Sequence, residues 1–489
     1  MASDPHTTMT VTSPELANVR ARNESLIFSV GFALAAVFHV LGNPRLAPPW
    51  SLAVLGLAAG WVLLMPRSGP ARTALAVSIL GTAWLEAPLL GNHWLLTSLV
   101  ALAWLVASLI GALRGHSEEE VWLRFARTAR LTLLVAYSFA AFAKLNADFF
   151  DPVVSCAGFY LRESAGSIGF DALAESSTGW IDRVAMFGTA GIELAIPVLL
   201  VVRRTRPFAV VLAIAFHYVL AIDRTHEFFD FSSLLTVLFL LFASTEVQQG
   251  LVDAIGNVIR RLASWWTPLP ELLHLLGAAA VVGALALPLG SRDWPLADVF
   301  RDIGLVSFWL MAAAVWVVVA RATWRTRTRP SEPASLRPVV GLLLVLPALA
   351  FLNGLTPYTE VKTGYGWNMY SNLRTVDGES NHFIIRSTLP LTDQQSSLVR
   401  VVESSDPRLA FYGRFDYLLT YDRFRDHLSR HRDVSVTYER DGEVVTVERA
   451  GDVPDLARAL PEVERRLLLF RAVDGRAHER CLQGFGPVQ

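Results

Sequence analysis

The sequence predicts a polytopic α-helical membrane protein of about eleven transmembrane helices, followed by a small C-terminal extracytoplasmic, β-containing α+β domain. Three observations support this fold class. Hydrophobic residues make up 53% of the 489 residues and charged residues only 18%, which is typical of a membrane protein. Arginines concentrate in alternate connections between apolar runs, and the composition becomes that of a soluble domain after residue 354. The formal net charge of −1 gives no indication of nucleic-acid binding.

The first element is a polar N-terminal tail, residues 1–24, which lacks the charged start and cleavage site of a signal peptide. We expect this tail to lie in the cytoplasm. Apolar runs of about 17 to 22 residues then predict a transmembrane bundle over residues 25–355, because about 20 apolar residues cross the hydrocarbon core as a helix. The expected spans are 25–42, 50–65, 73–91, 94–113, 131–147, 183–202, 207–222, 231–244, 269–289, 302–320 and 338–354.

Arginine placement predicts the orientation of this bundle, since short cytoplasmic loops carry an excess of positive charge. Alternate connections contain arginines, beginning with Arg67 and Arg72, whereas the intervening ones are poor in arginine or acidic, as in DRTHEFFD at 223–230. We therefore expect a multi-pass protein of the cell membrane with a cytoplasmic N-terminus and an extracytoplasmic C-terminal domain. Residues 114–130 combine mixed charges with spaced aromatic residues and predict an amphipathic helix on the cytoplasmic surface.

The last part of the chain, residues 356–489, has the pattern of a small folded domain. Residues 433–449 alternate between apolar and polar on both sides of Asp441-Gly442, which is a strong signal for a β-hairpin. Residues 381–387, NHFIIRS, predict another strand. Residues 421–431 and 454–470 predict amphipathic helices.

Lysine usage points to a functional residue in the bundle. The chain has only two lysines, Lys144 and Lys362, among 43 Lys and Arg residues, so arginine does nearly all ordinary basic work. Lys144 lies in the apolar segment LTLLVAYSFAAFAKLN. An amine in a low-dielectric environment loses its proton far more readily than a guanidinium does, and an ionisable residue inside a membrane is by default a functional candidate.

Six polar residues from five predicted spans fall in one half of the bilayer, with Glu193 near its middle. They are His39, Glu86, Lys144, Asn146, Glu193 and His217. Because isolated charges in lipid are costly and pair with one another, their convergence predicts a buried polar cavity that opens toward the outer domain.

Each of these residues also has a purely structural interpretation. Lys144 could extend to the outer headgroups, and His39 could be a satisfied structural histidine. Glu193, followed by Pro197, could mark a kinked and hydrogen-bonded helix. Glu86 could lie at the interface, and a transporter could use the same cluster as a proton relay. The sequence alone does not choose among these alternatives.

Four ordered motifs carry a resemblance to a known family. The segment FAAFAKLNADF at 139–149 resembles the K-L-D-A-D-W signature of vitamin K-dependent γ-glutamyl carboxylases and of the wider horizontally transferred transmembrane (HTTM) family. The other three motifs are Asn92-His93, Phe216-His217 and Trp367-Asn368-Met369. The resemblance covers about residues 25 to 390. It departs from the signature at Asn146, which replaces Asp, and at Phe149, which replaces Trp.

The resemblance implies a reaction and a set of site residues. Lys144 matches the family's catalytic base, which deprotonates a reduced naphthoquinone, vitamin K or menaquinol. Reaction with O2 then produces the base that removes a γ-proton from glutamate in a protein substrate, and CO2 traps the carbanion. His93 and His217 match the family's histidines and are expected to handle protons or to position the quinol. We expect no metal, and the residues expected to bind the cofactor are Asn92, Asn146, Glu86, Glu193 and Trp367.

Two alternatives to the enzyme remain open at the level of sequence. The chain could be a non-catalytic HTTM protein that binds or transports a small molecule or lipid, or a structural partner of another membrane protein. The two cysteines, Cys156 and Cys481, both fall on the predicted outer side, where oxidation is permitted. They either form a disulfide that ties the outer loop to the tail or are free thiols.

Overall fold

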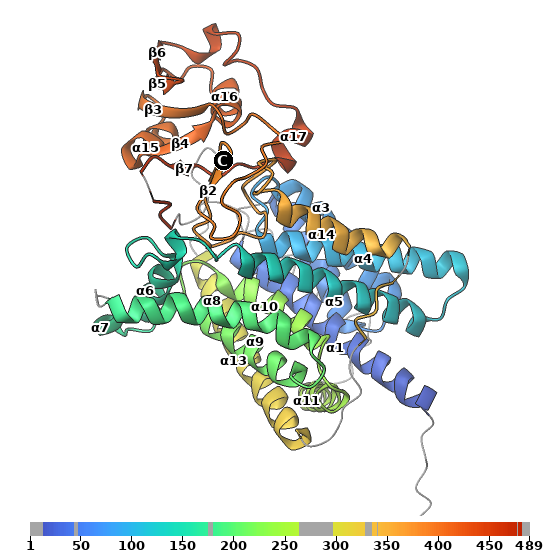
Figure 1. Ribbon diagram of the computed structural model, residues 1–489. Coiled ribbons are helices and arrows are strands. Elements are labelled where there is room, and N and C mark those ends of the chain that lie inside the picture. The colour runs from blue at the N-terminus through green and yellow to red at the C-terminus, as the bar shows by residue number, and fades with distance from the viewer. Residues whose placement is uncertain are drawn as a thin grey trace, which may run out of the picture.

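The computed structural model describes residues 13–43, 47–174, 179–263, 297–327, 335–339, 341–476 and 478–481. Figure 1 shows a mostly helical molecule in which the C-terminal domain lies over one end of a helical bundle. The predicted span at 269–289 lies outside the described residues. The bundle contains helices α1 (Ser13–Gly42), α2 (Pro49–Leu64), α3 (Gly69–Glu86), α4 (Asn92–Arg114), α5 (Glu118–Phe142), α6 (Cys156–Ser167), α7 (Asp171–Ala174), α8 (Gly179–Val201), α9 (Arg206–Leu220), α10 (Phe228–Leu240), α11 (Thr245–Ala263), α13 (Ala297–Thr326) and α14 (Val345–Leu355).

Several of these helices have the length and composition of membrane spans. Among the described residues, four stretches are long and apolar enough to cross a membrane: Val19–Gly42, Asn92–Arg114, Gly179–Val201 and Asp298–Thr326. Four shorter apolar helices accompany them: Pro49–Leu64, Arg206–Leu220, Phe228–Leu240 and Leu342–Leu355. These helices are compatible with a membrane protein. The number of eleven spans remains a prediction.

Helix α5 differs from its predicted form. The expected surface helix and the following span are one continuous helix, Glu118–Phe142, since no Gly or Pro interrupts them. It begins at a capping box, in which the Ser117 hydroxyl accepts from the Glu120 N–H and the Glu120 carboxylate accepts from the Ser117 N–H. Helix α5 ends just before Lys144, so this lysine lies in the turn that follows the helix.

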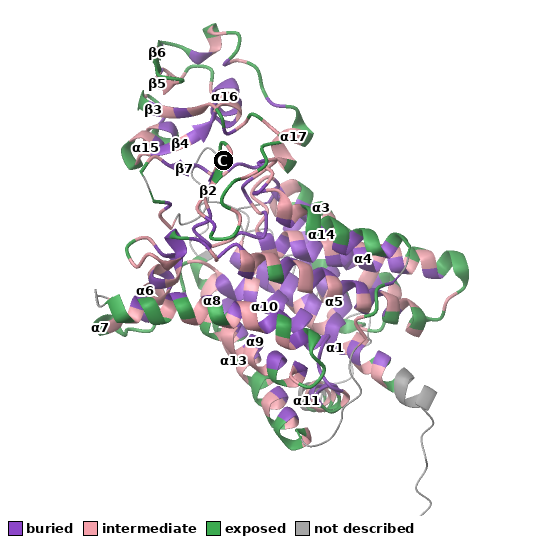
Figure 2. Ribbon diagram, in the orientation of Figure 1, coloured by how far each residue is buried: buried purple, intermediate pink, exposed green. Residues whose placement is uncertain are grey.

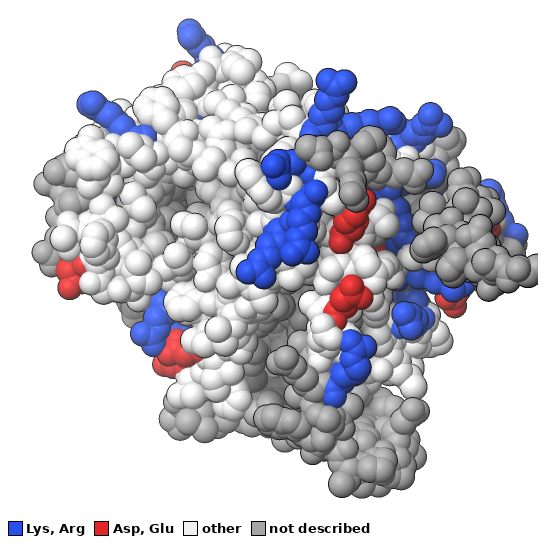
Figure 3. Space-filling view, turned by 90° about the horizontal axis from the view of Figure 1, so that it is seen from below, with Lys and Arg blue, Asp and Glu red and all other residues white. Residues whose placement is uncertain are grey.

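The two ends of the bundle have different chemistry. Buried residues concentrate in the middle of the bundle (Figure 2). At one end, Arg22 of α1 pairs with Glu119 of α5 at 3.2 Å, and Arg72 of α3 donates to Ser25 at 3.0 Å. Seen from below, basic side chains gather on part of the surface with few acidic ones (Figure 3). At the other end, Arg466 of the C-terminal domain donates to the Ala87 carbonyl at 3.1 Å. Arg22 and Arg72 thus lie at the end of the bundle that is remote from the C-terminal domain.

The C-terminal domain is a five-stranded antiparallel sheet with flanking helices. Its strand order is β6-β5-β3-β4-β7, and the predicted hairpin is confirmed, with Val436 opposite Val447 and Arg440 opposite Glu443. Asp441 and Gly442 both have positive φ (52° and 80°), as a two-residue hairpin turn requires. The strands are β1 (Thr375–Val376), β2 (Glu379–Ser380), β3 (Leu398–Ser404), β4 (Tyr417–Thr420), β5 (Val436–Arg440), β6 (Glu443–Val447) and β7 (Val473–Asp474), and the helices are α15 (Pro407–Phe415), α16 (Tyr421–Arg430) and α17 (Glu462–Leu467).

Two predictions for this domain are wrong. Residues 381–387 do not form a continuous strand, because their hydrogen bonds are divided between two partners. Phe383 N donates to the Leu145 carbonyl at 2.9 Å at the end of α5, whereas the Arg386 carbonyl accepts from Ser380 N of β2 at 3.0 Å. The helix expected over 454–470 is reduced to the six residues of α17, since Pro461 lacks the N–H that a continuous helix needs at that position. The helix expected at 421–431 is confirmed as α16.

The segment between α14 and β3 forms a layer over the end of the bundle. Trp367 in this layer is 2% exposed and packs in the main core of the bundle. Cys156, at the start of α6, forms a disulfide with Cys481 with the Cα atoms 4.9 Å apart, which confirms the pairing alternative. The bundle and the C-terminal domain are thus joined by both packing and a covalent bond.

Candidate functional site

A cavity of about 210 Å³ lies under this layer, between α4, α5, α6, α8, α9 and α10. Its wall is largely apolar and aromatic, including Tyr137, Tyr160, Phe216 and Phe231. The titratable side chains among its lining residues include Lys144, Glu193, His93 and His217, which come from four separate parts of the chain. The fold thus brings both candidate histidines and the candidate base to one cavity.

Lys144 is buried and paired inside this cavity. Its Nζ lies 2.8 Å from Oε2 of Glu193 on α8, and the two side chains are only 5% and 11% exposed. The same amine donates to the carbonyls of Ala140 and Met369, each at 3.4 Å. Lys144 therefore does not extend to the protein surface. Glu193 does more than mark a kink before Pro197, because its carboxylate is paired with Lys144.

The ion pair sets the chemistry of the amine. Two buried groups of opposite charge can exchange one proton, which leaves either an ammonium with a carboxylate or an amine with a carboxylic acid. A low-dielectric cavity disfavours the charged form, because desolvation of both ions opposes their attraction. Glu193 is therefore the carboxyl group within reach to share a proton with Lys144.

His93 belongs to a network of buried hydrogen bonds that the sequence did not predict. Asp230 Oδ2 lies 2.8 Å from His93 Nε2, 2.8 Å from His39 Nδ1 and 2.7 Å from Asn43 Nδ2. The other nitrogen of His39 lies 2.8 Å from Glu86 Oε1. Asp230 falls within the segment predicted as an acidic outer loop, but it lies in α10, and its carboxylate contacts both rings.

A second, more polar cavity of about 350 Å³ lies on the other side of His93. The two cavities share the wall residues Asn92, His93, Met369 and Tyr370. The second cavity is also lined by His39, Glu86 and Arg471. Glu86, expected to bind the cofactor, therefore lies in the polar cavity and not beside Lys144.

His217 also lines the Lys144 cavity. Its Nε2 lies 3.3 Å from the hydroxyl of Tyr137, and its Nδ1 is buried without a hydrogen-bond partner among the described residues. A buried polar atom without a partner is costly unless a ligand or water satisfies it. His217 thus presents an unused hydrogen-bonding group in a cavity with room for a small organic molecule.

The remaining predicted residues build the walls of the site. Asn92 Oδ1 accepts from the backbone N–H of Trp367 at 3.0 Å, and the indole N–H of Trp367 donates to Ala350 at 2.6 Å. Both residues also line the first cavity. Asn146 does not line either cavity; it donates to the carbonyls of Ala143 and Ser371 and so shapes the turn that carries Lys144.

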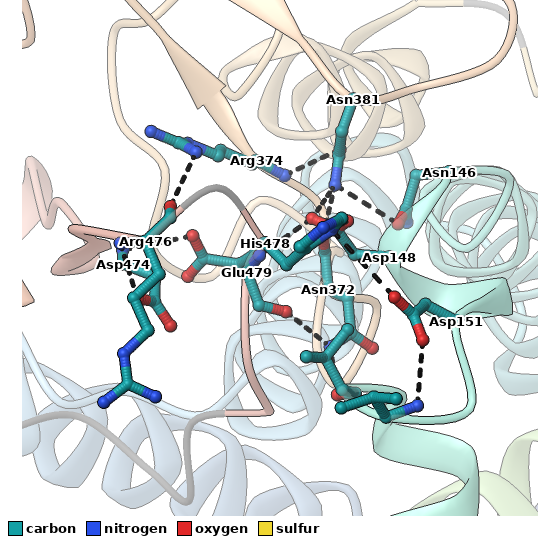
Figure 4. A network of polar contacts seen from close by, with 12 residues as sticks. Asn146, Asp148, Asp151, Asn372, Arg374, Asn381, Asp474, Arg476, His478 and Glu479 are labelled. Carbon is teal, nitrogen blue, oxygen red and sulfur yellow. Dashed lines mark hydrogen bonds and ion pairs between the residues drawn. The ribbon is translucent and has the colours of Figure 1, made fainter.

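The turn after Lys144 is joined to the chain's C-terminal segment by the polar network in Figure 4. Asp148 accepts from the Asn381 side chain and from the Glu479 backbone N–H, each at 2.8 Å. Asn372 donates to the carbonyls of Val154 and Glu479, each at 2.9 Å. Burial raises the pKa of Glu479 to about 7. These contacts hold the outer loop in place beside the disulfide.

Two clusters of described residues also have spacings that a metal ion could use. They are His39, His93 and Asp230, and Asp406, His427 and His431. In the second cluster Asp406 caps α15 and accepts from the Arg408 guanidinium at 3.0 Å and from the Arg408 backbone N–H at 2.8 Å. Burial acts to raise the pKa of Asp406, but hydrogen bonds from Arg408 and His427 outweigh it and hold this pKa below its usual range. Hydrogen bonding thus accounts for the second cluster.

Comparison with known proteins identifies no relative: no family model, no curated protein and no solved structure matches the chain. The site is therefore interpreted from its own residues.

Proposed function

We propose that the chain is a membrane enzyme of the vitamin K-dependent γ-carboxylase-like (HTTM) type. Lys144 is its base and a reduced naphthoquinone, vitamin K or menaquinol, is the molecule that it deprotonates. The observation that carries this proposal is a buried amine in a largely apolar cavity that also contains two histidines. The proposed location is the cell membrane, with the C-terminal domain outside the cytoplasm.

The residues present fit a flat, mostly apolar ligand with polar edges. Aromatic side chains provide the walls, while the amine of Lys144 and the free Nδ1 of His217 can reach polar atoms of a ligand. When bound, the reduced quinone would react with O2 to supply the strong base needed to remove a γ-proton from a glutamate side chain, to which CO2 is then added.

Each residue has a separate proposed role. Lys144 accepts a proton from the quinol hydroxyl, and Glu193 holds the proton that the amine carried before. His93, held by Asp230, stands between the quinol cavity and the polar cavity and positions the second reactant. The apolar walls exclude water, which would otherwise quench a carbanion. The protein substrate would approach from the side of the C-terminal domain.

The alternative function is a non-catalytic membrane protein that binds or transports a small molecule or lipid. The ion pair between Lys144 and Glu193 favours it, because an ammonium held by a carboxylate is not a base. In that case the same cavity would bind a quinone without changing it. The two functions differ in whether bound quinol is consumed.

The test measures epoxide formation by the purified, full-length protein supplied with reduced vitamin K or menaquinol and O2. We expect epoxide from the wild type and none above background from Lys144→Arg, because a guanidinium keeps the charge but does not lose its proton. Lys362→Arg, at the chain's other lysine, is the matched control and should retain full activity. Equal epoxide yield from the wild type and Lys144→Arg would remove the proposed role of Lys144.

A binding measurement separates the enzyme from the alternative. Quenching of tryptophan fluorescence reports quinone binding, since Trp367 lines the cavity. Saturable binding to the wild type without epoxide formation would support the binding protein. Lys144→Met, which is closer in size to lysine than arginine is, should still bind quinone. Labelled CO2 with a glutamate-containing peptide tests the carboxylation step separately.

A further inference from the structure

The C-terminal domain exposes a cluster of large apolar side chains in one loop. We call residues 383–391, between β2 and β3, the apolar loop. Phe383, Ile384, Leu389 and Leu391 in this loop are each between 50% and 68% exposed. Four such residues within nine positions form a patch that is unusual on a water-exposed surface, where apolar side chains are normally scattered singly.

This loop is fixed against the end of the bundle. Phe383 N donates to the Leu145 carbonyl at 2.9 Å, directly after Lys144. Leu389 N donates to the Tyr358 carbonyl at 2.9 Å, and Leu391 N donates to the Thr359 carbonyl at 3.0 Å, just beyond α14. Hydrogen bonds therefore fix the loop beside the C-terminal ends of α5 and α14.

The patch is also continuous with the outer surface of helix α8. The ring of Phe383 stacks on Phe150 with the centroids 5.8 Å apart, and Phe150 contacts Phe187 of α8 at 5.0 Å. Phe187 is 63% exposed and belongs to one of the four stretches with the length and composition of a membrane span. On such a helix, exposed apolar side chains face lipid. The same lipid surface would extend to Phe383.

We propose that the apolar loop inserts into the bilayer leaflet next to the C-terminal domain. Its aromatic and aliphatic side chains would lie at the boundary between headgroups and acyl chains, where amphipathic surfaces bind. The exposed Arg386 in the same loop matches the phosphate groups at that depth. A second copy of this chain or another protein would also cover the patch, but neither explains why the patch is continuous with the exposed apolar surface of α8.

Insertion of the loop would also stabilise the turn that carries Lys144. His382, beside the loop, has its Nε2 2.9 Å from the Phe142 carbonyl, and Asn381 accepts from Ala147 N at 3.1 Å. These bonds satisfy carbonyl and N–H groups on both sides of Lys144. The bilayer contact thus supports the turn that carries the lysine, whether the cavity is catalytic or only binds a ligand.

Spin labels test the insertion directly. Both native cysteines are paired in the disulfide, so an introduced cysteine supplies the free thiol for labelling. Nitroxide labels would be attached to Ile384→Cys and Leu389→Cys in the full-length protein in phosphatidylcholine vesicles. The matched control is Val444→Cys, at a residue of the β5–β6 hairpin that is 65% exposed.

Accessibility to molecular oxygen and to a water-soluble nickel chelate distinguishes the outcomes. We expect the ratio of oxygen to nickel accessibility at positions 384 and 389 to exceed that at position 444 several-fold, because oxygen partitions into the bilayer and the chelate does not. Equal ratios at all three positions would overturn the insertion. Labels at 384 and 389 that are inaccessible to both reagents would also overturn it and would indicate a protein partner.

Discussion

The pair of Lys144 and Glu193 allows a quantitative test that is independent of any enzyme assay. Removal of one partner from a buried ion pair leaves an uncompensated charge and costs about 3–5 kcal/mol, whereas replacement of both by apolar residues of similar volume is often close to neutral. With the Nζ to Oε2 distance of 2.8 Å and side-chain exposures of 5% and 11%, this pair belongs to the buried class. We therefore expect Lys144→Met and Glu193→Leu each to destabilise the protein by roughly 3 kcal/mol, with neutralisation of the remaining group reducing the loss.

The double variant decides whether the two residues are coupled. Lys144→Met with Glu193→Leu should be close to the wild type in stability, because replacement of both partners by apolar residues is often nearly neutral. The loss in the double variant should therefore be far smaller than the sum of the two single losses. The assay is reversible unfolding in mixed detergent micelles, followed by tryptophan fluorescence. Lys362→Met combined with Glu193→Leu is the control and should give additive losses, because no ion pair joins Lys362 to a carboxylate among the described residues. Strictly additive single effects would refute the buried pair.

Three further predictions follow from other contacts. Asp230→Asn removes the charge that holds His93 and His39. It should reduce epoxide formation, or quinone affinity in a binding protein, by about 10- to 150-fold, the effect of a charge-assisted hydrogen bond of about 1.5–3 kcal/mol. An unchanged value would exclude Asp230 from the site. Replacement of Cys156 and Cys481 by Ser should lower the free energy of unfolding by about 2–5 kcal/mol, since the disulfide closes a loop with a sequence separation of 325. Thermal unfolding with and without reductant measures the loss. Equal stability of the wild type and the double Ser variant would contradict this prediction. Burial raises the folded-state pKa of Glu479 to about 7, so the folded protein retains a proton that the unfolded chain loses near pH 4.5. The stability of the tail should therefore fall by roughly 3 kcal/mol as the pH rises from about 4.5 to 7. Hydrogen exchange of the Cys481 amide measures this slope, and Glu479→Gln should remove it.

Local features of the fold were predictable, because they depend on neighbouring residues. The hairpin follows from alternation around Asp441-Gly442, and helix α16 from its amphipathic pattern. The pairing of Cys156 with Cys481 was one of two open alternatives, since redox context permits a disulfide but does not impose one. The strand predicted over residues 381–387 is wrong, because their composition favours extended structure, whereas their hydrogen bonds to the end of α5 and to β2 depend on tertiary packing.

The candidate site was predictable only in part. Unusual lysine usage singled out Lys144, and the motifs singled out His93 and His217. Asp230 gave no signal, because its partners His39 and His93 are 191 and 137 positions away in sequence. A carboxylate in a segment with other charges is usually solvated, and only tertiary packing turns it into the acceptor between two imidazole rings. Residues whose role depends on such distant contacts require the structure.

The position of His93 between the two cavities constrains both proposed functions. The Lys144 cavity has mostly apolar walls, whereas the cavity with Glu86 and Arg471 is polar. A ligand that fills the first cavity meets the ion pair of Lys144 and Glu193 among apolar walls. The proposed enzyme requires Lys144 to transfer its proton to Glu193 in that complex, whereas the proposed binding protein requires the ion pair to persist. His39, hydrogen-bonded at 2.8 Å to a carboxylate on each side, has both ring nitrogens occupied, so His93 is the histidine of this network that both cavities share.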